Sequence, residues 1–348
     1  MIKVEELFIE PTATVLETLR KLDETGQRIL FIAPEGHLKA VITDGDIRKF
    51  FLRGGTPDQT VDHAANYHPL SVSVSERGKA RSILQEHCID ALPVLNKRGI
   101  ITDIIFAHGL DLDNRKQVDI PVVMMAGGLG TRLYPYTKIL PKPLIPVGEL
   151  PIIELIMREY QRYACSDFHI IVNYKKELMK AYFADNERQY HISWYDEEQP
   201  LGTGGGLSLL KGKLHSTFFF ANCDALLTSN YESIVKFHRE NGNAITMVCA
   251  YKNINIPYGV VEMGPGGVIT GMKEKPLMSF LTNTGIYLVE PEVVDDLTDG
   301  EAIGFPDIVE RQRQKGRRVA VFPVPENDWM DMGQISELEK MRERLYGE

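Results

Sequence analysis

A glycine-rich loop followed by two cations is the part of this sequence best suited to chemistry. The loop comprises Ala126, Gly127, Gly128, Gly130 and Thr131. Because glycine has no Cβ, three glycines in four positions let backbone N–H groups approach a phosphate closely. Arg132 and Lys142 supply the positive charge that a polyphosphate needs. The pattern is typical of a loop that binds a nucleoside triphosphate.

Two other phosphate-binding loops fit this segment poorly. A Walker A loop requires a lysine directly after its glycines, and none stands there. A dinucleotide fingerprint requires a third glycine where Leu133 stands, and then a crossover helix. Four prolines, at positions 135, 141, 143 and 146, exclude that helix. A tight turn without a ligand is the remaining alternative, and the charges of Arg132 and Lys142 argue against it.

The composition is that of a soluble globular protein and limits the choice of partners. A length of 348 residues suggests two or three domains. A net charge of -9 without a basic stretch makes nucleic acid and anionic membranes poor partners. No apolar run approaches the ~20 residues of a membrane span, and the first residues lack a signal-peptide core. Four scattered cysteines without a Cys-x-x-Cys motif favour a reducing cytoplasm over zinc or disulfides.

The front third of the chain contains a repeat. Residues 12–47 and 73–105 each read as a helix, an apolar strand, a short turn and a second strand that ends in Thr-Asp. One copy cannot bury its sheet face alone, so two copies should pack against each other. We expect repeats at about residues 8–55 and 66–110, within a domain that covers residues 1–115.

This front domain resembles a tandem pair of CBS domains, an α+β module. Such pairs often bind adenine nucleotides, and the resemblance implies that Thr43 and Asp46 hold a ribose. In the second copy, Ile105 occupies the position of the acid, so at most one cleft should bind in the usual way. A dimerisation module without a ligand is an equal alternative.

The remainder of the chain, residues 116–348, alternates between apolar and helical stretches. Residues 109–121 are polar and bounded by Gly and Pro, which places the boundary there. The alternation predicts an α/β domain, with a Rossmann-like, mainly parallel sheet that carries helices on both faces. In such sheets ligands bind beyond the carboxyl ends of the strands, where the glycine loop should also lie.

Two acids are candidate ligands of Mg²⁺. Asp224 follows the apolar run Phe218–Ala221, and Asp331 lies between large apolar residues just before a C-terminal helix. Mg²⁺ prefers one or two carboxylates together with substrate phosphates. The alternative for Asp224 is a helix N-cap or a turn residue after the strand. For Asp331 that role is unnecessary, because Ser336 and Glu339 form a capping-box pattern.

Two further segments could provide specificity. Gln199, Gly202 and Thr203 open a glycine-rich stretch with an exposed backbone and a hydroxyl, suited to reading the edge of a base, or alternatively a flexible loop. Glu274, Lys275 and Asn283 offer a carboxylate, a cation and an amide, which sugar and phosphate recognition needs.

In their order these segments resemble the sugar-1-phosphate nucleotidyltransferases over residues 120–348. The matching motifs are Gly-Gly-x-Gly-Thr-Arg-Leu, Pro-Lys-Pro-Leu, Leu-Gly-Thr-Gly-Gly, Asn-x-Asp, Tyr-Gly-Val-Val, Glu-Lys-Pro, Asn-Thr-Gly-Ile-Tyr and Trp-x-Asp-x-Gly. One departure is Asn222-Cys223-Asp224, where the family usually has glycine before the acid. The resemblance implies the nucleotide-diphospho-sugar transferase fold and attack of a sugar 1-phosphate on an NTP, with Arg132, Lys142 and Asp224 catalytic. It also implies that Asp224 and Asp331 bind Mg²⁺, and that Gly259, Glu274, Lys275 and Asn283 face the sugar.

A CBS pair ahead of such a domain resembles the guanylyltransferases that make GDP-glucosamine for bacterial legionaminic acid synthesis, which favours GTP and glucosamine 1-phosphate. Thymidylyl or uridylyl transfer to glucose 1-phosphate, or guanylyl transfer to mannose or heptose 1-phosphate, are alternatives. A nucleotide sensor with a vestigial transferase domain is an alternative of another class. We also expect a homo-oligomer.

Overall fold

The computed structural model describes residues 3–87, 89–107, 117–184 and 189–346. The chain forms two compact units, Met1–Arg115 and Lys116–Glu348, which are described separately. Most of the expected linker, residues 109–121, lies outside the described residues. Within the described part of the chain, every helix is too short or too polar to traverse a lipid bilayer.

The front unit contains two small sheets with the same topology. In each, the first strand runs parallel to the central strand and the third strand runs antiparallel to it. The first sheet and its helices comprise β1 (Phe8–Ile9), α1 (Val15–Thr25), β2 (Ile29–Ile32), β3 (Ala40–Thr43) and α2 (Asp44–Leu52). The second comprises β4 (Val72–Ser73), α3 (Ala80–His87), β5 (Ala91–Leu95) and β6 (Ile101–Phe106). Each half thus begins with a short strand that the sequence pattern does not reveal.

Helix α1 shows how local chemistry sets these elements. Thr14 caps its N-terminus in a reciprocal capping box with Glu17. Gly26 ends the helix in the left-handed conformation, with φ of 62°. Between these ends, Val15, Leu19 and Leu22 are buried on one face.

The second unit is built on a seven-stranded sheet. Its order is β11-β10-β7-β12-β17-β14-β18, and only β17 runs antiparallel to its neighbours. The strands are β7 (Val122–Met125), β10 (Asp167–Val172), β11 (His191–Asp196), β12 (Phe218–Asn222), β14 (Ile245–Asn255), β17 (Leu277–Val289) and β18 (Val319–Pro325). The expected α/β domain with a sheet rich in parallel pairs is therefore present.

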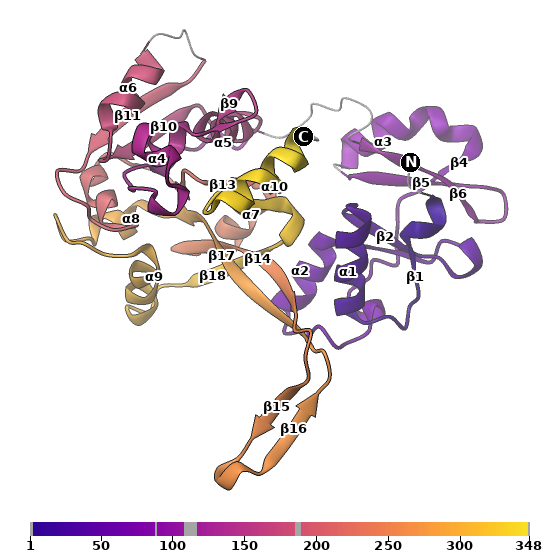
Figure 1. The fold of residues 1–348 in the computed structure, drawn as a ribbon. Helices are drawn as coiled ribbons and strands as arrows, with labels where there is room; N and C mark the ends of the chain where they lie inside the picture. The colour runs from indigo at the N-terminus through magenta and orange to yellow at the C-terminus, as the bar shows by residue number, and fades with distance from the viewer. Residues whose placement is uncertain (1–2, 88, 108–116, 185–188, 347–348) are drawn as a thin grey trace. The chain divides into compact units, whose positions relative to one another are not determined.

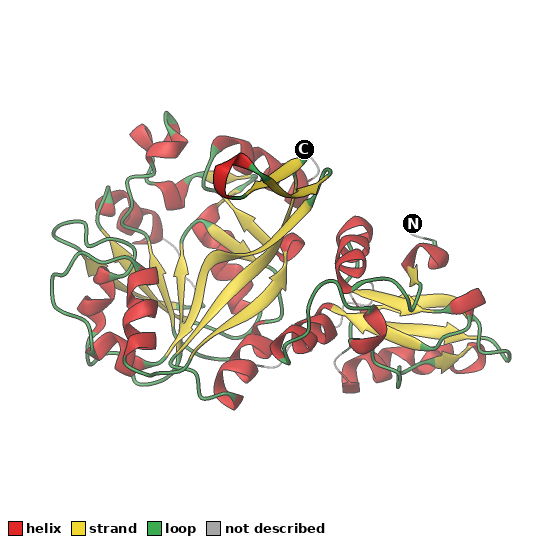
Figure 2. Cartoon of the chain, turned by 90° about the horizontal axis from the view of Figure 1, so that it is seen from below, coloured by secondary structure: helices red, strands yellow, loops and turns green. Residues whose placement is uncertain are grey.

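Successive side chains of the central strand β12 enter two separate cores. Phe219 packs against Tyr160 of α5 (Ile152–Gln161) and Tyr231 of α7 (Tyr231–Glu240). Phe220 points to the other face and packs against Phe305 of α9 (Phe305–Gln314), with ring centroids 4.7 Å apart. A strand buried on both faces reads as the continuous apolar run seen in the sequence. Figure 2 shows helices on both sides of the sheet.

Shorter elements complete this unit (Figure 1). They are α4 (Tyr136–Ile139), β8 (Pro146–Val147), β9 (Leu150–Pro151), α6 (Lys176–Ala184), β13 (Ala225–Leu227), α8 (Pro291–Asp295), β19 (Trp329–Asp331) and α10 (Ile335–Tyr346). Strands β14 and β17 continue past the sheet as a two-stranded ribbon. At its end the chain forms a hairpin of β15 (Val260–Met263) and β16 (Ile269–Lys273), which projects from the unit in Figure 1.

Candidate active site

The glycine loop emerges directly from the carboxyl end of β7. Ala126 N–H still donates to Ile171 of the neighbouring strand, at 2.8 Å. The N–H groups of the next four residues, Gly127 to Gly130, donate to no acceptor in the described part of the chain. Gly130 has φ of 64°, and a Cβ there would lie 2.8 Å from Thr137 Cγ2 and 3.1 Å from Lys142 Cβ. The loop therefore offers a row of backbone donors, as the sequence predicts for an anion site.

Lys142 lies beneath this loop and is buried. It opens a 3₁₀ turn, Lys142–Leu144, whose neighbouring prolines restrict the backbone on both sides. Its Nζ donates to Asp224 Oδ2 in an ion pair whose side chains are 11% and 16% exposed. Two charges that are largely shielded from water interact more strongly than an ion pair at the surface.

Asp224 and Asp331 come together although 107 positions separate their numbers. Strand β13 follows Asp224 and pairs with β19, so that Ala225 lies opposite Asp331. Met332 N–H also donates to the Asp224 carbonyl, at 2.9 Å. Burial raises the pKa of Asp331, the negative charge of Asp224 raises it further, and Lys142 and Arg132 oppose both effects. These four side chains therefore share one electrostatic environment.

The two carboxylates fit a magnesium ion that is completed by substrate. A larger His, Cys, Asp or Glu cluster is not found among the described residues, and Mg²⁺ needs only one or two carboxylates beside phosphates and water. Gly333 supports the arrangement, because a Cβ there would lie 2.7 Å from Asp331 Oδ2. The N-cap alternative for Asp224 is wrong, since a strand follows it. The turn alternative describes its position, because Asp224 lies in the turn between β12 and β13.

The capping box expected at Ser336 and Glu339 is also wrong. Helix α10 already begins at Ile335, so Ser336 lies inside its first turn and cannot be the N-cap. Gln334 precedes the helix, and its carbonyl accepts from Glu337 and Leu338. Asp331 nevertheless stays outside the helix start, at the end of β19.

The glycine-rich stretch after Gln199 is more enclosed than expected. Gln199, Gly202 and Thr203 are exposed, whereas Gly204, Gly205 and Gly206 are buried. Gly204 and Gly205 leave no room for a Cβ against the backbone of residues 301–305. The Thr203 hydroxyl accepts from Phe305 N–H at 3.1 Å, at the start of α9. Only the rim of this stretch could therefore read a base.

Glu197 is a buried acid that the sequence pattern does not single out. It follows β11, and its carboxylate lies against two glycines: a Cβ on Gly127 would approach Oε2 to 2.8 Å, and one on Gly206 would approach Oε1 to 2.5 Å. Burial raises the pKa of Glu197 to about 7, and a hydrogen bond from the Leu201 backbone partly offsets the rise. Oε1 has no partner among the described residues. Glu197 thus joins the glycine loop to the Gln199 loop. The sequence carries no signal for this, since nothing distinguishes it from its neighbour Glu198.

Of the four residues expected to face the sugar, Gly259 and Glu274 lie together, since a Cβ on Gly259 would approach Glu274 Oε2 to 2.9 Å, whereas Asn283 lies apart from them. Asn283 lies in the middle of β17, near Asn222, whose side chain packs on Gly285. Gly259, Glu274 and Lys275 are exposed at the root of the hairpin. From Leu277 to Asn283 the strand is extended for six residues, which is about 20 Å.

In the front unit, Thr43 and Asp46 form hydrogen bonds with each other. Thr43 Oγ1 donates to Asp46 Oδ2 at 2.6 Å, and Asp46 N–H donates to Thr43 Oγ1 at 3.2 Å. Together they form a capping box at the start of α2. This local role accounts for both residues without a ligand, so the ribose contact stays a prediction.

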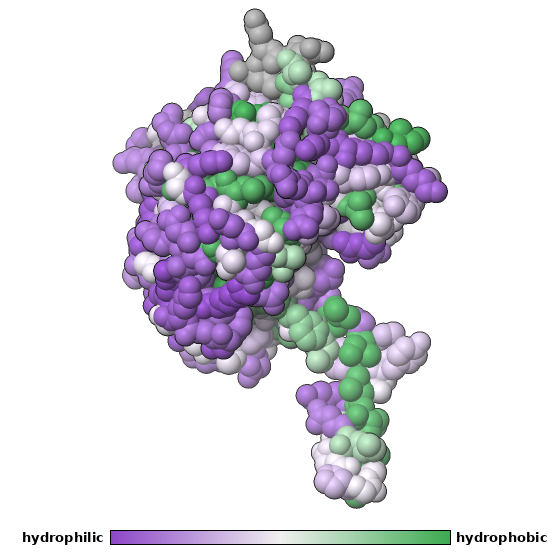
Figure 3. All heavy atoms as spheres, turned by 90° about the vertical axis from the view of Figure 1, so that its left-hand side faces the viewer, coloured by the Kyte–Doolittle hydropathy of each residue, from purple (hydrophilic) through white to green (hydrophobic). Residues whose placement is uncertain are grey.

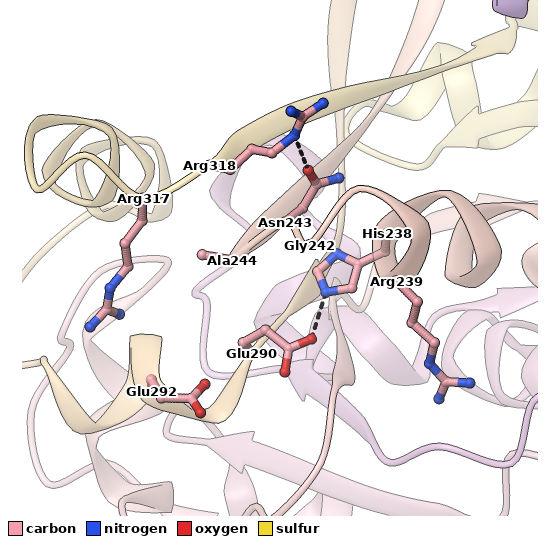
Figure 4. A pocket seen from close by; sticks show the side chains of 9 residues that line it. All are labelled: His238, Arg239, Gly242, Asn243, Ala244, Glu290, Glu292, Arg317 and Arg318. Carbon is pink, nitrogen blue, oxygen red and sulfur yellow. Dashed lines mark hydrogen bonds and ion pairs between the residues drawn. The ribbon is translucent and has the colours of Figure 1, made fainter.

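A separate pocket of about 620 Å³ lies where β14 and β18 begin, at the edge of the sheet opposite Asp224 (Figure 4). Three of its polar side chains already have partners: His238 Nε2 lies 2.8 Å from Glu290, Arg318 donates to Asn243 at 2.9 Å, and Arg317 pairs with an aspartate. The residues that line it include none of the predicted site residues.

Known proteins resemble more than half of this chain. The chain is 33% identical to a mannose-1-phosphate guanyltransferase of Schizosaccharomyces pombe and 32% identical to one of Pichia angusta, over 61% of this chain and 60% of each relative. It thus spans about three fifths of the length of these curated relatives. The crystal structure of HddC from Yersinia pseudotuberculosis, complexed with GMP-PN, aligns with a TM-score of 0.51 at 18% identity. That alignment covers 65% of this chain and 99% of the other.

The family model described as nucleotidyl transferase matches residues 121–346. The match begins one residue before β7 and ends at the last residue of α10. It therefore includes the glycine loop, Lys142 and both converging acids. The chain belongs to the nucleotidyl transferase family.

Proposed function

We propose that the chain transfers a nucleotidyl group from an NTP to a sugar 1-phosphate and releases pyrophosphate. The observation that carries this proposal is the convergence of Lys142, Asp224 and Asp331 beside a loop of free backbone donors. A phosphate oxygen of the sugar 1-phosphate attacks the α-phosphorus, and the bond from that phosphorus to the bridging oxygen of pyrophosphate breaks. No base is needed, because the attacking oxygen is already anionic. Such transfers depend mainly on positioning and charge neutralisation.

Each group of residues has its own role in the proposed reaction. The Gly127–Gly130 amides and the exposed Arg132 hold the triphosphate and stabilise the leaving pyrophosphate. Lys142 neutralises the α-phosphate, where charge grows in the transition state. Asp224 and Asp331 would hold Mg²⁺, which would supply further charge neutralisation. Gln199, Gly202 and Thr203 face the base, at the exposed rim of their loop.

We favour GTP as the donor and glucosamine 1-phosphate as the acceptor, which gives GDP-glucosamine. The relatives named mannose-1-phosphate guanyltransferases support guanine and make mannose 1-phosphate the principal competing acceptor. The fused front unit, with its resemblance to a CBS pair, supports glucosamine. Thymidylyl or uridylyl transfer to glucose 1-phosphate and guanylyl transfer to heptose 1-phosphate also compete with this assignment.

A substrate matrix tests the proposal. Each of GTP, dTTP, UTP, CTP and ATP is combined with glucosamine, mannose, glucose and heptose 1-phosphate, and released pyrophosphate is measured with Mg²⁺ and with EDTA. We expect the highest kcat/KM for GTP with glucosamine 1-phosphate and no turnover in EDTA. Turnover with another pair would change the substrate assignment alone. Silence across every pair would favour a nucleotide sensor with a vestigial transferase domain.

The front unit is proposed as an adenine-nucleotide site at Thr43 and Asp46. Calorimetric titration of the full chain with AMP, ADP and ATP tests this, with Asp46→Ala as the matched variant. We expect binding that the variant loses. Absence of heat with all three nucleotides would leave the unit as an assembly module.

A further inference from the structure

The short helix α4 lies between the two cations assigned to the triphosphate. It begins at Tyr136, shortly after Arg132, and ends at Ile139, shortly before Lys142. Thr137 is its buried residue, whereas Ile139 is 75% exposed. A helix of one turn is unstable alone, and burial of an apolar face normally supplies the missing stability. Residues 136–139 present no such face, so other contacts must hold them.

Hydrogen bonds from two residues that follow β10 hold α4 in place. The Tyr174 hydroxyl donates to the Thr137 carbonyl at 3.2 Å. Lys175 Nζ donates to the carbonyls of Lys138 and Ile139, the latter at 2.8 Å. The last carbonyls of a helix have no partner within it, and a lysine side chain can supply one. These contacts replace the apolar packing that α4 lacks.

The backbone at Lys175 shows how much depends on its side chain. Its φ is 52°, in the left-handed region that favours glycine. A residue with a Cβ loses stability there, and the two hydrogen bonds from the ammonium offset that loss. Figure 3 views the second unit from the side that bears α6, and the side chains there are mostly hydrophilic. Polar contacts therefore dominate this side of the unit.

The same segment also contacts the glycine loop. Tyr174 N–H donates to the Gly127 carbonyl at 3.4 Å. The Thr137 hydroxyl of α4 donates to the Gly130 carbonyl at 2.9 Å. The glycine loop, α4 and the turn after β10 thus form one hydrogen-bonded set, and the exposed Arg132 lies within it.

We propose that Lys175 is a positioning residue for nucleotide binding, because by holding α4 it fixes the segment that carries Arg132. The inference rests on the proposed nucleotidyl transfer, in which Arg132 contacts the triphosphate. Lys142 needs no such support, since its ion pair with Asp224 anchors it. Loss of the Lys175 ammonium should therefore weaken NTP binding more than it slows the chemical step.

Steady-state kinetics of the full-length chain test this role. Lys175→Met keeps the stem and removes the charge, and we expect KM for the NTP to rise on the order of tenfold. Values of kcat and of KM for the sugar 1-phosphate should change little. Lys175→Arg should recover most of the affinity, because a guanidinium can donate to both carbonyls. In an Arg132→Ala chain, Lys175→Met should raise KM no further, since it acts through Arg132.

Limited digestion with trypsin measures the hold on α4 without turnover. The bond after Lys138 contains a carbonyl that Lys175 binds, so Lys175→Met should be cut there on the order of tenfold faster. Cleavage after the exposed Lys273 of β16 is the internal standard. Lys176→Met is the matched control, because Lys176 is the next residue and pairs with Asp196 instead. It should match the wild type in both experiments.

Equal cleavage after Lys138 in wild type and Lys175→Met would overturn the proposal. An unchanged KM, or an equal rise of KM in the Arg132→Ala chain, would also overturn it. If the wild type releases no pyrophosphate, the proposed reaction fails, and calorimetric titration with the NTP decides the role of Lys175 separately. An unchanged Kd in Lys175→Met, or no binding by the wild type, would then refute it, whereas a Kd raised on the order of tenfold would support it.

Discussion

Lys142 combines burial with a partner, Asp224, that the proposed reaction also needs. In that reaction its charge is in position before the substrate arrives, so no reorganisation is needed during transfer. Lys142→Met keeps most of the stem and removes the charge. We expect kcat to fall by on the order of 10² or more, with KM for the NTP changed less, because the charge acts most strongly in the transition state.

The matched control is Lys236→Met, which removes an equally long cation from an exposed i,i+4 pair with Glu240 on α7. Steady-state pyrophosphate release measures both variants, and circular dichroism checks that they fold. Wild-type kcat in folded Lys142→Met would remove Lys142 from the mechanism.

Gly333 offers a test of Asp331 that leaves the carboxylate in place. A Cβ at this position would lie 2.7 Å from Asp331 Oδ2, closer than van der Waals contact allows, so Gly333→Ala should displace that side chain. We expect lower kcat and a higher Mg²⁺ concentration at half-maximal activity, with little change in melting temperature. Gly78→Ala is the control, because a Cβ there meets nothing within 4 Å. Unchanged Mg²⁺ dependence in Gly333→Ala would count against Asp331 as a ligand.

At the scale of elements, Glu197 joins two loops and makes their stability depend on pH. Its pKa is about 7 in the folded chain, against 4.5 as the ordinary value. The folded state therefore binds more protons between these values, and stability falls as pH rises from about 4.5 to 7. This contribution amounts to about 3 kcal/mol at most. Glu197→Gln should remove it and flatten the profile across that window.

Thermal midpoints of both chains at pH 5, 6, 7 and 8 measure this effect. The thermal midpoint of the variant, relative to that of the wild type, should increase as pH rises. The control is Glu198→Gln, because Glu198 is the neighbour of Glu197 and is exposed. This variant should follow the wild-type profile. Parallel profiles for wild type and Glu197→Gln would mean that the carboxyl keeps its ordinary pKa.

The elements that sequence predicted well are those whose signal is local. An apolar run indicates a buried strand without reference to the rest of the chain, as it does for β7 and β12. A periodic pattern indicates an amphipathic helix in the same way, as it does for α10. The positions that sequence could not predict depend on distant partners. The pairing of β13 with β19 joins Asp224 to Asp331. The sequence offered both acids as candidate Mg²⁺ ligands, but no local pattern specifies that pairing. Glu197 is distinguished from Glu198 by packing against Gly127 and Gly206 alone.

The same limit explains why Asn283 lies apart from the other predicted sugar residues. The motifs that contain Glu274 and Asn283 are close in sequence, which suggests a single site. An extended strand separates them in space, because each residue adds about 3.3 Å. The direction of that ribbon is set by its pairing with β14, which the sequence pattern does not specify.

At the scale of the whole molecule, this separation sets a condition on the proposed chemistry. Glu274 and Lys275 lie beside the β15–β16 hairpin, at least about 20 Å of strand from Asn283. In the expected homo-oligomer, a site that uses both ends would draw them from two copies. We expect that chains carrying Asp224→Ala and chains carrying Glu274→Gln are each nearly inactive, and that their mixture regains activity.

The recovery arises because a mixed dimer can assemble one site with an intact Asp224 from one copy and an intact Glu274 from the other. Pyrophosphate release after mixing and re-equilibration measures it. Asp224→Ala mixed with Asp331→Ala is the control, because both acids lie in the same chain's site and no combination of copies restores the pair. A mixture of Asp224→Ala and Glu274→Gln that stays at the mean of its components would place both residues in the site of a single chain, or exclude Glu274 from sugar recognition.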